Sequence, residues 1–127
     1  MSRNGQHRQP RILVVENDPA TQAFLQYVLS KRFRVDIAGG ADEAERLAQK
    51  HTYDVALIDI GLDGDTSGLD VLKHLKSRAT TAEAAMIACT AYAMPGDRDH
   101  FLDRGFDGYI SKPFTRERLI GIVEDVL

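Results

Sequence analysis

Short apolar runs recur along this sequence, and segments with helical periodicity alternate with them. The runs are short and nearly all apolar, which fits strands buried on both faces of a parallel sheet. The alternation therefore predicts an α/β fold in which one five-stranded parallel sheet has helices on both faces. The expected strands are Arg11–Val15, Phe33–Ala38, Asp54–Ile58, Ala85–Thr90 and Asp107–Ile110.

The helix signals lie between and after these strands. Asp18 followed by Pro19 is typical of an N-cap with proline at the first helical position. The apolar face of this first helix is expected to comprise Phe24, Leu25, Val28 and Leu29. The other helices are marked by apolar spacing in residues 41–48, 69–75, 97–104 and 119–126, with Phe101 and Leu102 of the fourth expected to face inward.

Composition limits the possible class of protein. The chain has 127 residues, 43% of them hydrophobic, which suits one domain with a real core. A net charge of −3 gives no case for nucleic acid or an acidic membrane, and no apolar run is long enough to span a bilayer. The single cysteine, Cys89, excludes an internal disulfide and fits a reducing compartment. We expect a cytoplasmic domain over residues 11–127, preceded by a flexible basic tail over residues 1–10; the sequence indicates no oligomeric state.

Polar side chains follow the ends of these predicted strands. In "DVALIDIGLDG", the apolar run Val55–Ile58 stops on a carboxylate, Asp59. Because open α/β sheets bind ligands outside the carboxyl ends of their strands, the other strand ends matter as well. The residues at those ends are Glu16, Asn17, Asp18, Thr90, Ser111 and Lys112.

The residue types at this edge suit phosphoryl chemistry. Carboxylates and carbonyl oxygens are the ligands that Mg²⁺ prefers. An ammonium and a hydroxyl can bind phosphoryl oxygens, and an aspartate can be a nucleophile that forms an aspartyl phosphate. From the residues alone, the edge is a candidate Mg²⁺-assisted phosphoryl site.

Four segments, "ILVVEND", "DVALIDI", "ACTAYA" and "GFDGYISKPF", carry a family resemblance. Together, and in this order, they resemble the receiver domain of two-component response regulators over about Arg11 to Leu127. The resemblance implies a (βα)5 flavodoxin-like receiver fold. Within the family, the sequence is most similar to stand-alone regulators and to receivers of hybrid sensor kinases.

The resemblance also implies roles for individual residues. Asp59 matches the phosphoryl-accepting aspartate, Thr90 the hydroxyl that closes on the phosphoryl group, and Lys112 the lysine that pairs with it. Tyr109 matches the aromatic switch residue, although ordinary half-buried packing is the alternative. The bond between Lys112 and Pro113 is often cis in the family.

The implied metal ligands for Mg²⁺ are Glu16 through water, Asn17, Asp59 and the backbone carbonyl of Gly61. Asn17 is a departure, because the family usually has a metal-binding aspartate there. The lost charge should weaken Mg²⁺ binding. Asp18 is an alternative ligand, but we interpret it as the helix cap. Asn17 also leaves open a degenerate receiver that never carries phosphate.

The implied function is a signalling switch. A histidine kinase or a histidine phosphotransfer protein would phosphorylate Asp59, and the face formed by the fourth helix, fifth strand and fifth helix would then bind a downstream protein. Such a receiver is no enzyme toward other molecules, since it catalyses only its own phosphorylation and dephosphorylation; we expect no contact with nucleic acid or membrane.

Two other functions are alternatives to this one. The first is a phosphorylation-independent binding module. The second is a phosphatase of the haloacid dehalogenase type, which is disfavoured because Gly61 stands where a second aspartate would follow the nucleophile. Around the site, the loop after Asp59 reads as a turn. Gly61 and Tyr92 lie where family side chains tune phosphoryl hydrolysis, which predicts a long-lived phosphoryl group.

Overall fold

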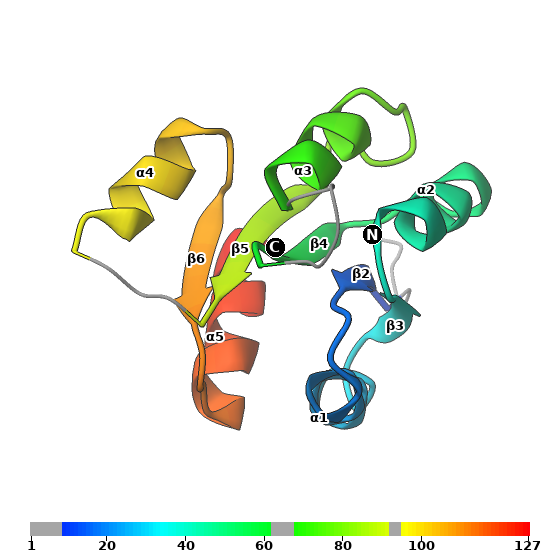
Figure 1. Ribbon diagram of the computed structural model, residues 1–127. Helices are drawn as coiled ribbons and strands as arrows, with labels where there is room; N and C mark the ends of the chain where they lie inside the picture. Colours follow the sequence, from blue (N-terminus) through cyan, green and yellow to red (C-terminus); the bar gives the residue numbers. More distant parts are fainter. Residues whose placement is uncertain (1–8, 62–67, 92–94) are drawn as a thin grey trace.

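The computed structural model describes residues 9–61, 68–91 and 95–127 of the chain (Figure 1). The expectations for the tail at residues 1–8, for the loop at residues 62–67 and for Tyr92 lie outside the described residues. Within them, strands and helices alternate along the chain, as the sequence predicts.

All five strands belong to one parallel sheet with the order β3-β2-β4-β5-β6. Their bounds are β2 Arg11–Val15, β3 Arg34–Ala38, β4 Val55–Asp59, β5 Ala85–Thr90 and β6 Gly108–Ser111. The chain leaves β2 on one side to form β3 and returns on the other to form β4. The carboxyl ends of β2 and β4 therefore flank the topological switch point, where such sheets bind ligands.

Three strands differ from their predicted bounds by one residue at one or both ends. Phe33 is buried but lies outside β3, because its amide donates to the Leu29 carbonyl at 2.9 Å and closes the turn after the first helix. Asp59, predicted to follow its strand, is the last residue of β4. At the last strand, the Asp107 carboxylate accepts a hydrogen bond from the Met86 amide at 2.8 Å, and β6 begins one residue later.

The helices cover both faces of the sheet (Figure 1). Their bounds are α1 Pro19–Leu29, α2 Ala41–Lys50, α3 Gly68–Lys76, α4 Asp97–Asp103 and α5 Arg116–Val126. One face carries α1 and α5, and the other carries α2, α3 and α4. The predicted architecture is thus confirmed. None of the helices in the described parts of the chain has the length and apolar character needed to cross a bilayer.

Two separate hydrophobic cores follow from the alternation of side chains along each strand. Ile12 and Val14 of β2 pack in the core under α1 and α5. Leu13 and Val15 pack in the core under α2, α3 and α4. Every residue of β4 is buried, so this central strand holds its last residue, Asp59, in a rigid setting.

Candidate functional site

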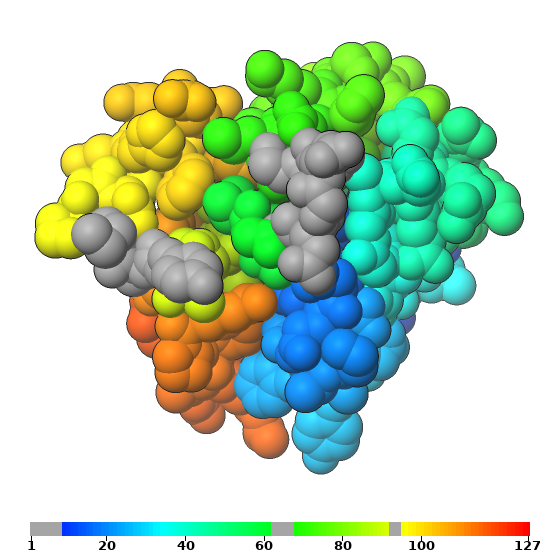
Figure 2. All heavy atoms as spheres, viewed as in Figure 1, coloured from blue at the N-terminus to red at the C-terminus, as the bar shows by residue number. Residues whose placement is uncertain are grey.

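Four of the sequence-predicted site residues come together at the carboxyl edge of the sheet. Glu16 follows β2, Asp59 ends β4, Thr90 ends β5 and Lys112 follows β6. In Figure 2 the residues after β2 (blue), at the end of β4 (green) and after β6 (orange) adjoin on one face of the molecule. Residues that are distant in sequence therefore form one site.

Lys112 connects the two acids of this site. Its Nζ donates a hydrogen bond to Oε1 of Glu16 at 2.7 Å and lies 3.6 Å from Oδ2 of Asp59. The backbone amide of Lys112 donates to the Thr90 carbonyl at 2.7 Å, which ties the segment after β6 to the end of β5. One ammonium is thus shared by two carboxylates, and it is closer to Glu16.

The charge of Lys112 is well maintained. Burial acts to lower its pKa, but the hydrogen bond to Glu16 and the charge of Asp59 outweigh burial, so the pKa of Lys112 is raised above its ordinary value. Lys112 is therefore positively charged at neutral pH.

Asp59 is held by its neighbours as well as by its strand. It is 7% exposed, and its Oδ1 accepts a hydrogen bond from the Gly61 amide at 3.0 Å. The Ile60 amide donates to the Cys89 carbonyl at 2.8 Å, which extends the pairing of β4 with β5 beyond the carboxylate. Burial raises the pKa of the adjacent Cys89 thiol to about 12, so this cysteine stays a neutral core residue.

Glu16 is fixed by the start of α1. It is 1% exposed, and its Oε2 accepts a hydrogen bond from the Asp18 amide at 2.9 Å. The Gln22 side chain donates to the Glu16 carbonyl at 2.5 Å. Asp18 in turn accepts from the Thr21 amide at 2.9 Å and from the Thr21 hydroxyl at 2.7 Å. Asp18 is therefore the N-cap of α1, and the side-chain hydrogen bond from Thr21 lowers the pKa of its carboxyl.

Comparison with known proteins decides the family. The sequence matches the family model of the response regulator receiver domain over residues 12–124. The chain belongs to the response regulator receiver domain family. It is therefore not one of the haloacid dehalogenase phosphatases that the sequence left as an alternative.

Relatives of this receiver domain differ in length. It is 32% identical over 117 residues to the probable transcriptional regulator ycf29 of Porphyra purpurea, covering 91% of this chain and 56% of the relative. It is 32% identical over 116 residues to the polar-differentiation response regulator DivK of Brucella ovis, covering 91% of this chain and 94% of DivK. The chain thus spans about half the length of some curated relatives and nearly all of others.

Solved structures agree with the fold. The receiver domain of the sensor histidine kinase PA1611 from Pseudomonas aeruginosa is 30% identical, with a TM-score of 0.80 and coverage of 92% of this chain and 96% of that one. That structure has a magnesium ion coordinated in its active-site cleft. Vibrio cholerae CheY4, with a TM-score of 0.85 at 22% identity and coverage of 94% and 99%, supports the fold alone.

The donor atoms of this receiver domain fit a magnesium ion. Because Asn17 stands where the family usually has an aspartate, they carry two negative charges instead of three. Glu16 and Asp59 present buried carboxylates at the switch point, half-buried Asn17 follows Glu16, and Gly61 follows β4. All of these offer oxygen, which suits Mg²⁺. Among the described residues, no group of three or more acidic, histidine or cysteine side chains is placed to hold a metal. Asn17 would add an uncharged amide oxygen to the two carboxylates.

The predicted switch residues lie in two different settings. Thr90 is 4% exposed at the end of β5. Tyr109 of β6 is half-buried, and its ring stacks on that of Phe101 in α4 with centroids 5.7 Å apart. Its hydroxyl is buried with no hydrogen-bond partner among the described residues, and burial raises the pKa of Tyr109. Tyr109 is therefore packed against α4.

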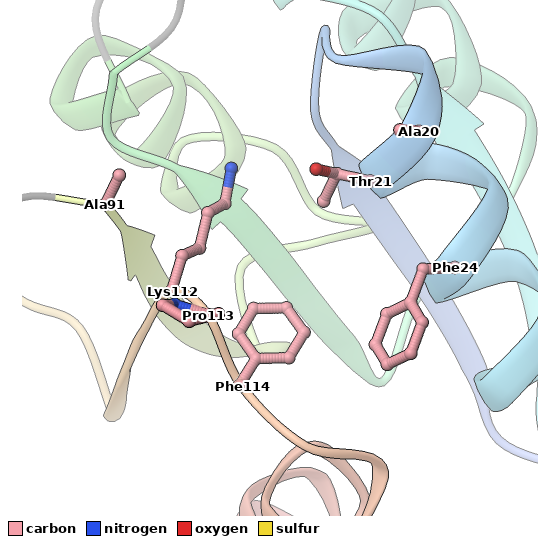
Figure 3. A pocket seen from close by; sticks show the side chains of 7 residues that line it. All are labelled: Ala20, Thr21, Phe24, Ala91, Lys112, Pro113 and Phe114. Atoms are coloured by element: carbon pink, nitrogen blue, oxygen red, sulfur yellow. The ribbon is translucent and has the colours of Figure 1, made fainter.

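A groove beside Lys112 was not predicted from the sequence. It has a volume of about 520 Å³ and lies between α1 and the segment after β6 (Figure 3). Phe24 was expected in the core, but it is 37% exposed and lies 6.0 Å from Phe114, centroid to centroid, at this groove. The lining residues are Ala20, Thr21, Phe24, Ala91, Lys112, Pro113 and Phe114. The Lys112–Pro113 peptide bond is cis. The groove thus joins an apolar surface to the acidic site.

Gly68 supports the site without presenting a side chain, a role that was not predicted from the sequence. A Cβ at this position would lie 2.7 Å from the Asp59 carbonyl oxygen and 2.8 Å from Cα of Ile60. The first residue of α3 therefore packs directly on the backbone at the end of β4. Gly68 directly precedes the helix predicted at residues 69–75, where glycine is a common N-cap residue, so its type gave no sign of this close contact.

Proposed function

We propose that this receiver domain accepts a phosphoryl group on Asp59 and works as a phosphorylation-controlled switch in a two-component system. The observation that carries the proposal is the buried Asp59 carboxylate with the Lys112 ammonium 3.6 Å away. A carboxylate held at a strand end beside a fixed cation suits attack on a phosphoryl group, whose oxygens need charge stabilisation.

The donor would be a phosphohistidine of a histidine kinase or of a histidine phosphotransfer protein. An Asp59 oxygen attacks the phosphorus, the new O–P bond forms, and the P–N bond to the donor imidazole breaks. The Lys112 ammonium stabilises the phosphoryl oxygens, and the Thr90 hydroxyl can donate to them afterwards. Mg²⁺, when bound by Glu16, Asn17, Asp59 and the Gly61 carbonyl, would supply further charge neutralisation. The domain would act only on itself.

The output would pass through Tyr109. A phosphoryl group adds about −1.5 to −2 charges at the strand ends. A movement of Thr90 toward that group would change the space beside Tyr109, whose ring stacks on Phe101 of α4. The face formed by α4, β6 and α5 would then present a different shape to a downstream protein. A change of population from 1:99 to 99:1 would need about 5.5 kcal/mol of differential interaction.

A phosphorylation-independent binding module is the alternative. Its only support is Asn17, because Asp59, Thr90 and Lys112 are all present and lie together at the sheet edge. The switch function therefore accounts for more of the site. We also propose that the domain works in the cytoplasm, where its single cysteine would stay reduced.

Incubation with acetyl phosphate tests the proposed function. We expect one phosphoryl adduct on the wild type in the presence of Mg²⁺ and little or none with a chelator, because the transferred group carries charge that Lys112 alone neutralises incompletely. Intact-mass spectrometry measures the adduct. No adduct on the folded protein at any Mg²⁺ concentration would favour the binding module.

The groove of Figure 3 is where we expect a protein donor to dock, since it is apolar and reaches Lys112. Phe24→Ala should raise the half-saturating concentration of a phosphorylated phosphotransfer protein by about fivefold, the effect of losing an interface aromatic that contributes about 1 kcal/mol. Phosphorylation by acetyl phosphate should be unchanged, because that donor needs no docking surface.

Leu127→Ala is the matched control for this variant. Leu127 is 54% exposed at the far end of α5 and lies outside the groove, so its loss should change neither reaction. The amount of phosphoryl group transferred to each variant, measured at a series of donor concentrations, separates the two variants. An equal loss with acetyl phosphate in Phe24→Ala would mean that Phe24 supports the fold rather than docking.

A further inference from the structure

A second groove lies between the second half of α3 and the turn that ends α4, on the face of the sheet that both helices cover (Figure 1). Its volume of about 430 Å³ falls within the range of about 300–1,000 Å³ that is typical of ligand pockets. We call it the α3–α4 groove. Its lining is mainly apolar and comprises Leu72, Lys73, Lys76, Ser77, Arg104 and Gly105. It shares no lining residue with the groove beside Lys112.

The floor of the α3–α4 groove depends on a glycine. Gly105 has a φ of 113°, the left-handed backbone conformation with which many helices end, and it follows α4 directly. A Cβ at Gly105 would lie 3.6 Å from Cδ2 of Leu72, so the turn rests on this leucine. Because glycine has no side chain, the turn leaves the space beside Leu72 open. The long methylene stems of lysine and arginine side chains can then flank that space with apolar surface.

Three cations and no carboxylate line this groove. Lys73, Lys76 and Arg104 are exposed, and none of them forms an ion pair with a carboxylate in the described parts of the chain. The chain as a whole has more acids than cations, 19 against 16. Four cations elsewhere do pair with carboxylates, namely Arg11, Arg32, Arg78 and Lys112. The positive charge of the α3–α4 groove is therefore available to a partner.

Two features of the molecule balance part of this charge. Cations at the C-terminal end of a helix interact favourably with its exposed carbonyl groups, and both helices end beside the groove. Lys76 also lines a neighbouring polar hollow that contains Glu83, Asp107 and Asp125. Lys73 and Arg104 do not line that hollow, so these two cations are the better probes of the α3–α4 groove.

We propose that the α3–α4 groove binds an acidic segment of a partner protein in which one large apolar side chain is flanked by carboxylates. The apolar side chain would pack on Leu72, and the carboxylates would pair with Lys73 and Arg104. A simple anion would gain nothing from the apolar floor, and an apolar side chain alone would gain nothing from the cations. A nucleic acid is disfavoured, because the net charge of −3 repels a long polyanion.

This surface differs from the two that the proposed function uses. The donor would dock in the groove beside Lys112, and the output would pass through the face formed by α4, β6 and α5. The α3–α4 groove instead lies along the second half of α3, away from Gly68 and the phosphoryl site. Binding to it is therefore expected in the unphosphorylated domain as well.

An NMR titration of the unphosphorylated, ¹⁵N-labelled domain tests the proposal. The probe is a five-residue peptide with capped ends and a central leucine between two pairs of glutamates. We expect saturable shifts of the amide signals of the residues that line the groove, and weaker binding at higher salt, because salt screens exposed charges. The same peptide with glutamines in place of the glutamates should bind more weakly, and so should a peptide with alanine in place of the leucine.

A double variant removes the two cations that line only this groove. Lys73→Gln combined with Arg104→Gln should raise the dissociation constant of the acidic peptide about fivefold, the effect of losing two exposed ion pairs. Arg46→Gln combined with Lys50→Gln is the matched control, because it makes the same change of net charge at exposed positions of α2. This control should bind like the wild type. The dispersion of the amide signals shows whether each variant is folded.

The possible results separate this inference from the proposed function. The inference is overturned by an absence of saturable shifts at the groove at millimolar peptide, or by equal binding of the glutamine peptide. An equal loss in the two double variants also overturns it, because net charge would then be the cause. A short single-stranded RNA that moves the same signals at lower concentration would replace the protein partner by a nucleic acid. Phosphorylation by acetyl phosphate should be the same in both double variants, so the inference can fail while the phosphoryl switch stands.

Discussion

Asp59→Asn is expected to abolish phosphoryl incorporation from acetyl phosphate and from a protein donor. Asparagine has nearly the same shape, and its side-chain oxygen can still accept the Gly61 amide hydrogen bond that Oδ1 of Asp59 accepts at 3.0 Å. The variant should therefore fold normally. It lacks the negative charge and the nucleophilic oxygen that form an aspartyl phosphate. Intact-mass spectrometry should show no adduct under conditions in which the wild type is modified.

Asp103→Asn is the matched control, since Asp103 is an exposed carboxylate on α4 and lies outside the site. It should be modified like the wild type. A stable adduct on Asp59→Asn would mean that another residue is the acceptor. Asp59→Ala gives a second comparison in a signalling assay, because full output from that variant would favour the binding module that works without phosphate.

The fold was predictable because the three central strands, β2, β4 and β5, are buried on both faces. In such a strand, apolar residues follow one another without alternating with polar ones, so the run itself marks the strand. The predicted bounds of β2 and β5 agree with the structure. The errors at β3, β4 and β6 arise where a residue's burial or charge does not reveal its backbone hydrogen bonds. Phe33 is as apolar as a strand residue, but its amide bonds to the helix before it.

The site was predictable only as a set of residues. Because parallel strands end at one edge, Glu16, Asp59, Thr90 and Lys112 had to lie near one another. The sequence does not reveal that Lys112 pairs more closely with Glu16 than with Asp59. Glu16 and Lys112 are 96 residues apart in the chain, and the distance between them depends on packing.

The groove and its aromatic residue show another limit of periodicity. Spacing along a helix predicts which side chains share a face, but it does not predict how far the neighbouring elements extend over that face. Leu25, Val28 and Leu29 are buried as expected, whereas Phe24 lies beyond the edge of the core against Phe114. Its exposed position was therefore visible only in three dimensions.

Gly68→Ala is expected to destabilise the domain by about 1–3 kcal/mol, the usual cost of overpacking a close contact. The added Cβ would lie 2.7 Å from the Asp59 carbonyl oxygen and 2.8 Å from Cα of Ile60, and both are backbone atoms that cannot rotate away. Either α3 or the end of β4 must shift. Urea unfolding measures the loss of stability. Because the displaced backbone carries Asp59, the proposed acceptor, phosphorylation by acetyl phosphate should also slow in the fraction that remains folded.

Gly121→Ala is the matched substitution at a position with free space. Gly121 lies within α5, and a Cβ there would meet nothing within 4 Å apart from its own helix and neighbours. Alanine should stabilise the domain by about 0.5–1 kcal/mol, because glycine loses more conformational freedom in a helix. The two glycine substitutions should thus have opposite signs. A Gly68→Ala variant as stable as the wild type would show that α3 can move away from β4 at no cost, so that the contact does not fix Asp59.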